Sequence, residues 1–188
     1  MMPISDEQMA TFVVFMRTHA IVTTALDREM IAEVGMPITW FEVLVYLSAS
    51  PGRRMRMRDL AQMIVLTRSG LTRLIDRLEK AEFTKREPCP GDRRGTFIAI
   101  TPEGISALRR CRPGHLSKIG EHLFRHLDDD DVRALYAILL KVLVKETGEK
   151  QQKLVSSFLS KILGKETPQG QRELLPPGHE LKVPTGAS

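Results

Sequence analysis

The stretch that decides the fold is Arg58–Gly104, RDLAQMIVLTRSGLTRLIDRLEKAEFTKREPCPGDRRGTFIAITPEG. From Asp59 onward its apolar residues take up helical spacing, and after a turn at Val65-Leu66 a second helix begins, for which Thr67 is a good N-cap. The apolar residues of this second helix recur at i, i+3, i+4 and i+7 as Leu71, Leu74, Ile75 and Leu78. The opposite face of this helix carries small polar side chains and basic side chains. Two such helices joined by a tight turn predict a helix-turn-helix.

The remainder of the stretch predicts a β-hairpin. Two alternating segments, Thr84–Glu87 and Thr96–Ile100, flank the turn CPGDRRG, which we expect to form a long tip. The hairpin directly follows the second helix, so we interpret it as a wing. Upstream, Arg53–Arg58 alternates Arg and Met and predicts a short, half-buried strand.

Helices are expected on both sides of this module. Residues 5–34 show helical spacing that ends near Gly35, and Trp40–Leu47 predicts a mostly buried helix that Pro51-Gly52 terminates. After the hairpin, Thr101 is a suitable N-cap with Pro102 at the first helical position, and that helix should continue to Leu127 with a kink or break at Pro113-Gly114.

The C-terminal part predicts two more helices. The acidic run Asp128–Asp131 suits a helix N-terminus, and Glu149–Lys165 is amphipathic. We therefore expect a mainly α protein with a small β-hairpin wing, divided into residues 1–36 (N-terminal dimerisation helix), 37–101 (winged helix-turn-helix), 102–166 (C-terminal dimerisation helices) and 167–188 (irregular tail).

Positive charge is concentrated in the winged module. The chain of 188 residues has a net charge of +5. Residues 52–95 contain twelve basic and six acidic side chains, a net charge of +6, which leaves −1 for the rest of the chain. A polyanion is the natural partner of such a module.

Several classes of protein are disfavoured. We find no apolar run close to the roughly 18 residues of a membrane span and no secretory signal, so we expect a cytoplasmic protein with no membrane partner. Two cysteines make no disulfide framework. We also find no phosphate-binding loop, nucleophile elbow or paired catalytic carboxylates, so we expect no enzyme and no cofactor.

The same stretch resembles the winged helix-turn-helix core of the MarR family of bacterial transcriptional regulators. The resemblance is carried by Leu60-Ala61, by the run Leu71–Glu79, and by Asp92 and Arg94 followed by Thr101 and Gly104. It implies a homodimer built from the terminal helices and a palindromic DNA operator. It further implies a function as repressor and release by a small molecule or by oxidation.

Two positions depart from the family pattern. Glu82 stands where the family usually has Gly, at the turn that leaves the recognition helix, and Arg58 stands where a Ser or Thr cap is favoured. If Glu82 adopts a left-handed conformation, the strain costs about 1 kcal/mol.

The recognition helix and the wing supply the predicted DNA contacts. For base edges or phosphates we expect Thr67, Ser69, Thr72 and Arg73, with Arg73 best suited to a bidentate contact with guanine. Arg68 and Arg77 are expected on phosphates. Either Arg93 or Arg94 of the wing should enter the minor groove, with Asp92 orienting a guanidinium.

Control by a ligand is less defined. The resemblance places an effector cleft between the dimerisation helices and the winged module, which makes His19, Thr23 and Trp40 candidate effector contacts. Zinc held by Cys111, His115, His122 and His126, oxidation of Cys89, and a dimeric module that does not bind DNA are the alternatives. Because Pro113-Gly114 should disrupt the first Cys/His pair and no further ligands complete a tetrahedral set, we assign no metal site.

Overall fold

The computed structural model describes residues 3–64, 66–89, 91–146 and 155. The chain divides into two compact units, Met1–Leu127 and Asp128–Ser188. The first unit runs in the order α1 (Asp6–Val34), α2 (Ile38–Ala49), a 3-10 turn (Pro51–Arg53), β1 (Arg54–Arg56), α3 (Met57–Met63), α4 (Arg68–Lys80), β2 (Thr84–Cys89), β3 (Asp92–Ile100), α5 (Pro102–His122) and a second 3-10 turn (Phe124–His126). The described part of the second unit contains α6 (Asp129–Glu146).

The first helix, α1, is long and exposes most of its apolar side chains. A capping box between Ser5 and Gln8 starts it, and Gly35, at φ 66°, ends it as predicted. Of its 29 residues only Leu26 and Met30 are buried. Its exposed large apolar residues are Met9, Phe12, Val13, Val14, Phe15, Met16, Ile21, Ile31 and Val34.

Our prediction of no segment long and apolar enough for a membrane span was wrong for α1. Among the described residues it is the one helix whose length and composition would suffice to cross a membrane. The reason is that Arg17 is the only charged residue between Glu7 and Asp27. The same composition suits a helix that is covered by an apolar partner.

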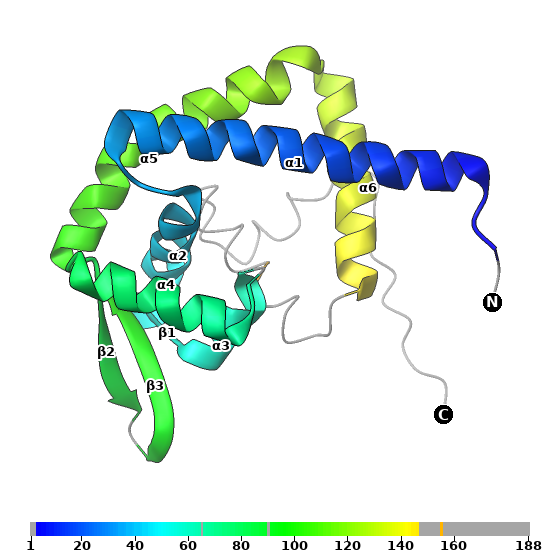
Figure 1. Ribbon diagram of the computed structural model, residues 1–188. Helices are drawn as coiled ribbons and strands as arrows, with labels where there is room; N and C mark the ends of the chain where they lie inside the picture. The colour runs from blue at the N-terminus through cyan, green and yellow to red at the C-terminus, as the bar shows by residue number, and fades with distance from the viewer. Residues whose placement is uncertain (1–2, 65, 90, 147–154, 156–188) are drawn as a thin grey trace, which may run out of the picture. The chain divides into compact units, whose positions relative to one another are not determined.

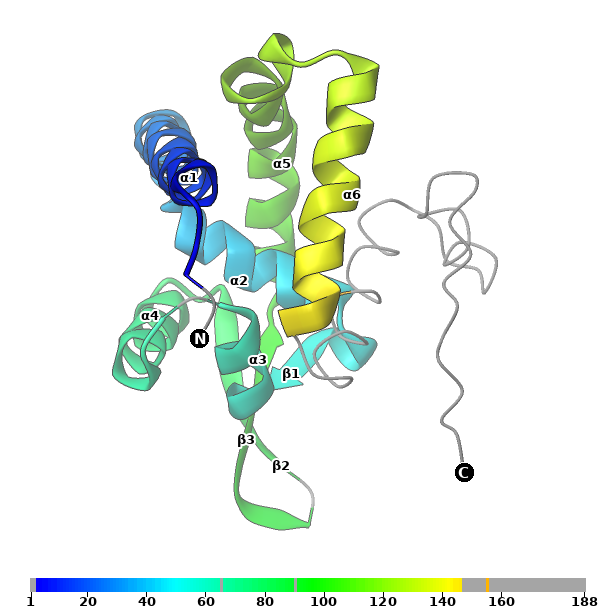
Figure 2. The ribbon, with the colours of Figure 1, turned by 90° about the vertical axis from the view of Figure 1, so that its right-hand side faces the viewer.

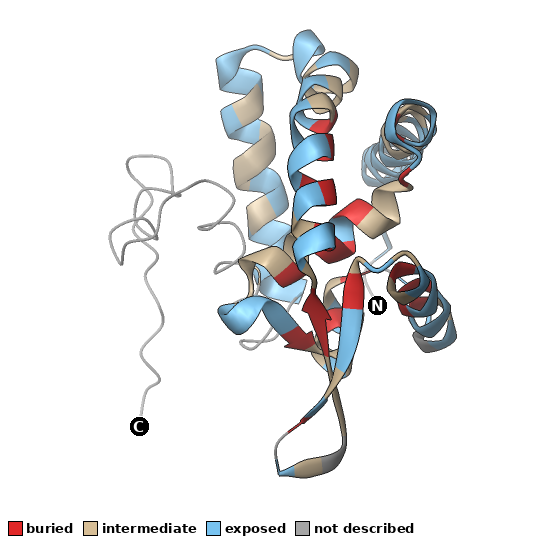
Figure 3. Ribbon diagram, turned by 90° about the vertical axis from the view of Figure 1, so that its left-hand side faces the viewer, coloured by how far each residue is buried: buried red, intermediate tan, exposed pale blue. Residues whose placement is uncertain are grey.

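The core of the first unit lies where α2, α3 and α4 pack on the sheet. Its fully buried side chains are Val43, Leu44, Leu47, Leu60, Leu71, Leu74, Ile75, Leu78 and Ile98. The apolar stripe predicted for the recognition helix is therefore the face of α4 that is buried in this core, while its other face is exposed (Figure 3).

Three antiparallel strands form the sheet in the order β1-β3-β2. Two details differ from the prediction. The first strand ends at Arg56 and α3 begins at Met57, so the N-cap is Arg56 and not Arg58. The hairpin strands pair as far as Cys89 and Asp92, so the tip is short and the residues from Asp92 to Gly95 belong to β3. The hairpin projects from the module on the side away from α1 (Figure 1).

The junction between α4, the sheet and α5 is closely packed. Glu82 has φ 62°, so it adopts the left-handed conformation that was considered for this position, where the family usually has Gly. The hydroxyl of Thr101 donates to the Glu82 carbonyl at 2.6 Å and accepts from the Gly104 amide as N-cap of α5. A Cβ on Gly104 would lie 2.2 Å from the Phe83 carbonyl oxygen, so only glycine fits there.

The helix α5 runs through Pro113 as one element, so the break considered at this position does not occur, and it ends at His122 before the predicted Leu127. The N-terminus of α6 begins at the acidic run as expected, with Asp128 and Asp131 capping each other's backbone amides. Apart from Val155, which is helical, the predicted helix 149–165 lies outside the described residues, and the tail 167–188 lies wholly outside them.

Candidate nucleic-acid interface

The exposed face of α4 carries most of the predicted DNA contacts. Thr67 caps the helix by accepting from the Gly70 amide at 3.1 Å. The exposed residues that follow on this face are Ser69, Thr72, Arg73 and Arg77. Arg68 lies in the first turn of α4, and its side chain is outside what the structure describes. The N-terminal half of α4 therefore presents hydroxyls and guanidinium groups to solvent.

Several acidic side chains of the winged module form internal ion pairs. Arg86 on β2 contacts both Asp76 and Glu79 of α4, and thereby ties the base of the wing to the recognition helix. Glu87 pairs with Arg54 and Lys85, whose hydrogen bonds hold the pKa of this carboxyl below its ordinary value.

By contrast, the cations of the outer face of α4 are available. Among the residues that the structure describes, Arg73, Arg77 and Lys80 form no ion pair. The guanidinium of Arg77 only approaches the carbonyl of Arg73, at 3.4 Å. Because the acids nearby are already neutralised by other bases, the positive field of the module is strongest where α4 faces solvent.

The carboxylate of Asp92 pairs with a guanidinium, but among the described residues this partner lies on β1 and not on the wing. Its Oδ2 accepts from Nη1 of Arg56 on β1 at 2.9 Å, so the pair joins β1 to the outer end of β3. The guanidinium carbons of Arg54 and Arg56 also lie 4.8 and 5.6 Å from the ring centroid of Phe97. The side chains of Arg93 and Arg94 are outside what the structure describes, so their predicted entry into the minor groove stays a prediction.

A groove of about 700 Å³ separates the recognition helix from the wing. Arg56 and Arg58 line it at the start of α3, Thr72 lines it from α4, and Asp92 and Thr96 line it from β3. Figure 2 shows how α3 and α4 lie beside the base of the hairpin. The helix and the wing thus form two projections with a polar groove between them.

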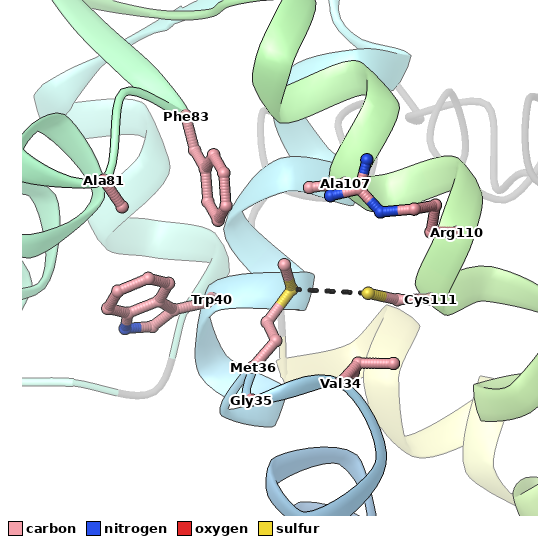
Figure 4. Close-up of a pocket in the computed structure, with 9 residues that line it drawn as sticks. All are labelled: Val34, Gly35, Met36, Trp40, Ala81, Phe83, Ala107, Arg110 and Cys111. Atoms are coloured by element: carbon pink, nitrogen blue, oxygen red, sulfur yellow. Dashed lines mark hydrogen bonds between the residues drawn. The ribbon is translucent and has the colours of Figure 1, made fainter.

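A second cavity, of about 310 Å³, lies between the end of α1, α2, the turn after α4, and α5. It is lined by Val34, Gly35, Met36, Trp40, Ala81, Phe83, Ala107, Arg110 and Cys111 (Figure 4). Trp40, one of the predicted effector contacts, meets Phe83 edge to face with ring centroids 6.1 Å apart. His19 is exposed on α1, and Thr23 donates its hydroxyl hydrogen to the His19 carbonyl; neither lines this cavity.

The alternative zinc site is not assembled. The described residues contain no group of three or more His, Cys, Asp or Glu side chains that could hold a metal. His122 bonds to Glu29 of α1 at 2.9 Å, and this hydrogen bond is the main reason that the pKa of Glu29 is lowered. His126 accepts from Arg125. Both cysteines are buried, so neither has the exposed setting of an oxidation sensor, and burial also raises the pKa of the Cys111 thiol.

Sequence reasoning missed Arg56, Arg110 and Met36. The period-2 pattern RRMRMR places Arg54 and Arg56 on the same face of a strand, so it contained the signal for the pair above Phe97. Arg110 and Met36 carry no local signal, because the cavity is formed by segments that are far apart in the sequence.

Helix, turn, helix and wing, with a basic outer face on the second helix, define a winged helix-turn-helix protein of the DNA-binding class. A family model for the MarR family matches residues 34–95. A MarR family transcriptional regulator from Streptomyces coelicolor, solved in complex with DNA, is 32% identical with a TM-score of 0.72, covering 80% of this chain and 94% of that one.

Two further relatives are also transcriptional regulators of this kind. AbsC, a MarR family transcriptional regulator from Streptomyces coelicolor, is 29% identical with a TM-score of 0.68, covering 77% of this chain and 97% of that one. The HTH-type transcriptional regulator MhqR of Bacillus subtilis is 27% identical over 138 residues, 73% of this chain and 92% of the relative. The chain belongs to the MarR family. It is a DNA-binding transcriptional regulator and not an enzyme.

Proposed function

We propose that the protein is a cytoplasmic repressor that binds a palindromic operator as a homodimer and is released by a small-molecule effector. The observation that carries the DNA-binding part is the exposed face of α4. There Arg73 and Arg77 form no ion pair with any described residue, and the neighbouring wing acids Glu87 and Asp92 are paired with bases of the module. A polyanion complements such a face.

The recognition helix is the element that reads the sequence. In a two-fold dimer each α4 enters a major groove, with half-sites about one helical turn, roughly 10 to 10.5 bp, apart. Arg73 makes a bidentate contact with guanine, and Ser69 and Thr72 contact base edges or phosphates. Thr67 contacts phosphate through the start of α4, while Arg68 and Arg77 bind phosphate and set the register.

The wing reads the neighbouring minor groove. Arg93 or Arg94 follows Asp92 on β3, and Arg56 holds the carboxylate of Asp92 at the outer part of the strand. A paired carboxylate repels DNA phosphates less than a free one, so the pair permits a close approach of the wing. Narrow A·T tracts, which concentrate negative potential, are the preferred flanking sequence.

The dimer is supported by α1. The apolar side chains of Phe12, Phe15 and Met16 on this helix are about half exposed. A second copy that covers them would remove a large apolar area from water. The family resemblance assigns the same role to the terminal helices.

The effector is proposed to occupy the cavity beside Trp40 and Phe83. Its walls come from the end of α1, from α2, from the turn after α4 and from α5, so a ligand there contacts both the dimerisation helices and the DNA-reading module. Mostly apolar walls with the single guanidinium of Arg110 suit an apolar or aromatic molecule that carries a negative group.

Selection of bound sequences from a random DNA pool, followed by a salt titration, tests this function. We expect one preferred palindrome and an affinity that falls steeply with salt. The replacement Arg94→Ala should weaken binding to that palindrome at least tenfold, about 1.4 kcal/mol, while the dimer persists. If the protein binds no DNA at low salt, it is a dimeric interaction module instead. Unchanged affinity of Arg94→Ala would reassign the minor-groove contact to Arg93.

A further inference from the structure

The strongest feature outside the DNA interface is a contact between two sulfur atoms. The thiol of Cys111, on α5, donates a hydrogen bond to the thioether of Met36, between α1 and α2, with Sγ of Cys111 and Sδ of Met36 4.0 Å apart (Figure 4). Both side chains are buried, with exposed fractions of 4% for Met36 and 6% for Cys111. Both also line the cavity of about 310 Å³, so a small ion has a route to them.

A buried histidine lies one helical turn further along α5. His115 is four residues after Cys111, and residues at this spacing lie on the same helix face. It is 9% exposed and packs on Phe41 with ring centroids 4.4 Å apart. Its Nδ1 is buried and has no hydrogen-bond partner among the residues that the structure describes. A buried imidazole nitrogen without a partner is costly, so it calls for an explanation.

We propose that Met36, Cys111 and His115 form a binding site for one soft monovalent metal ion of the copper(I) type. With metal–sulfur bonds of about 2.3 Å, the observed sulfur separation of 4.0 Å corresponds to a sulfur–metal–sulfur angle of about 120°. That angle is the one of a three-coordinate ion, and it leaves the third position to an imidazole nitrogen.

The ligand types select the ion. Thiolate and thioether sulfur are soft donors that favour copper(I). A structural zinc site takes four ligands from Cys, His, Asp and Glu, and this set of three residues contains only two of those types. On binding, the Cys111 thiol gives its proton to solvent and a sulfur–metal bond forms, with no change of oxidation state.

Charge points to the same ion. One thiolate and one monovalent cation give a neutral site, which a buried position accommodates at low electrostatic cost. A divalent ion would leave a net positive charge buried beside Arg110, another lining residue of the cavity. The site is distinct from the proposed effector contacts at Trp40 and Phe83, although it opens into the same cavity.

The test uses the full-length protein with silver(I), and with copper(I) under anaerobic conditions in competition with a chelator. We expect one ion bound per chain. X-ray absorption of the copper(I) form should show two sulfur neighbours and one nitrogen neighbour. Because it is measured on the unaltered protein, this spectrum tests the site even if a variant fails to fold.

Three substitutions assign the ligands. Met36→Leu keeps the side-chain volume and should weaken silver(I) and copper(I) binding at least tenfold, and Cys111→Ser should abolish it. His115→Gln should weaken copper(I) binding and remove the nitrogen neighbour. Cys89→Ser is the matched control, because Cys89 is an equally buried free cysteine, 4% exposed, in the wing, and binding should stay unchanged.

Three outcomes would overturn the proposal. The first is a Met36→Leu protein that binds both ions as the unaltered chain does, which would make Cys111 an ordinary thiol. The second is loss of binding in Cys89→Ser. The third is a spectrum with a single sulfur neighbour. Palindrome binding by the metal-free protein is measured separately, so failure of the metal site leaves the assignment of the DNA interface intact.

Discussion

The winged module and α1 expose opposite kinds of side chain to solvent: basic side chains on α4 and apolar side chains on α1. In the winged module the apolar stripe of α4 is buried and its outer face carries unpaired cations, among them Arg73 and Arg77. In α1 the charges between Glu7 and Asp27 are nearly absent, and side chains such as Phe12 and Phe15 are exposed. The exposed face of α4 therefore suits a polyanion, and the exposed face of α1 suits an apolar surface.

The largest effect should follow from charging the apolar face of α1. We expect the double substitution Phe12→Glu/Met16→Lys to raise the dimer dissociation constant about a hundredfold or more, because buried interface anchors contribute roughly 2 kcal/mol or more each. The pair at i, i+4 is itself favourable in a helix, so α1 should remain helical by circular dichroism. Sedimentation velocity measures the dimer.

Arg73→Ala is the reciprocal control for this experiment, since it should lose DNA affinity and keep the dimer. An unchanged dimer in the α1 variant would show that another surface joins the copies. Binding of the unaltered protein to neutral lipid vesicles would instead assign the apolar face of α1 to a membrane.

The next prediction distinguishes a contact with a base, made by Arg73, from a contact with phosphate, made by Arg77. Arg73→Ala should cost about 1–3 kcal/mol of operator binding and relax the preference at one base pair. Arg77→Ala should weaken binding to all sequences alike and reduce the slope of log affinity against log salt by about 1. Gel-shift titrations on the selected palindrome and on its single-base variants distinguish them. Equal loss of specificity in both variants would contradict the separate roles.

A smaller effect is expected at the pair that supports the wing. Arg56→Gln should weaken operator binding about threefold to tenfold, because Asp92 loses the positive charge of Arg56 and its carboxylate then repels the phosphates more strongly. The pair is partly exposed, so its coupling energy in a double-mutant cycle with Asp92→Asn should be about 0.5 kcal/mol. Strictly additive effects in that cycle would show that the two side chains act on DNA independently.

The smallest effect concerns stability alone. Glu82→Gly should raise the free energy of unfolding by about 0.5–1 kcal/mol, because glycine adopts the φ of 62° without strain. Glu82→Ala, which removes the carboxylate and keeps a Cβ, is the control and should bring no such gain. Urea denaturation measures both variants. A gain of equal size in the alanine variant would assign the effect to charge. Operator affinity should not change.

Local patterns were sufficient to predict much of the fold. The stripe from Leu71 to Leu78, the cap at Thr67 and the glycine after α1 each depend on residues close in sequence, and the structure confirms them. Helix spacing and capping are local properties, so a single sequence contains them.

Features that depend on pairing between distant segments could not be predicted in this way. The hairpin strands extend to Cys89 and Asp92 because β2 and β3 continue to hydrogen-bond through residues that read as a turn. Arg56 meets Asp92 only because β1 joins the far side of β3. The cavity beside Met36 and Arg110 is likewise formed by three segments that are far apart in the sequence.

The packing at Thr101 and Gly104 has a mechanical consequence. Thr101 bonds to the carbonyl of Glu82 and Gly104 packs against the carbonyl of Phe83, so the start of α5 is clamped to the turn that ends α4. Because the backbones are in close contact at this point, we expect α4 and the first turns of α5 to move as one rigid body. A rotation of the first turns of α5 by a few degrees should therefore turn the exposed face of α4 with it, and in the proposed dimer this would change the spacing of the two recognition helices.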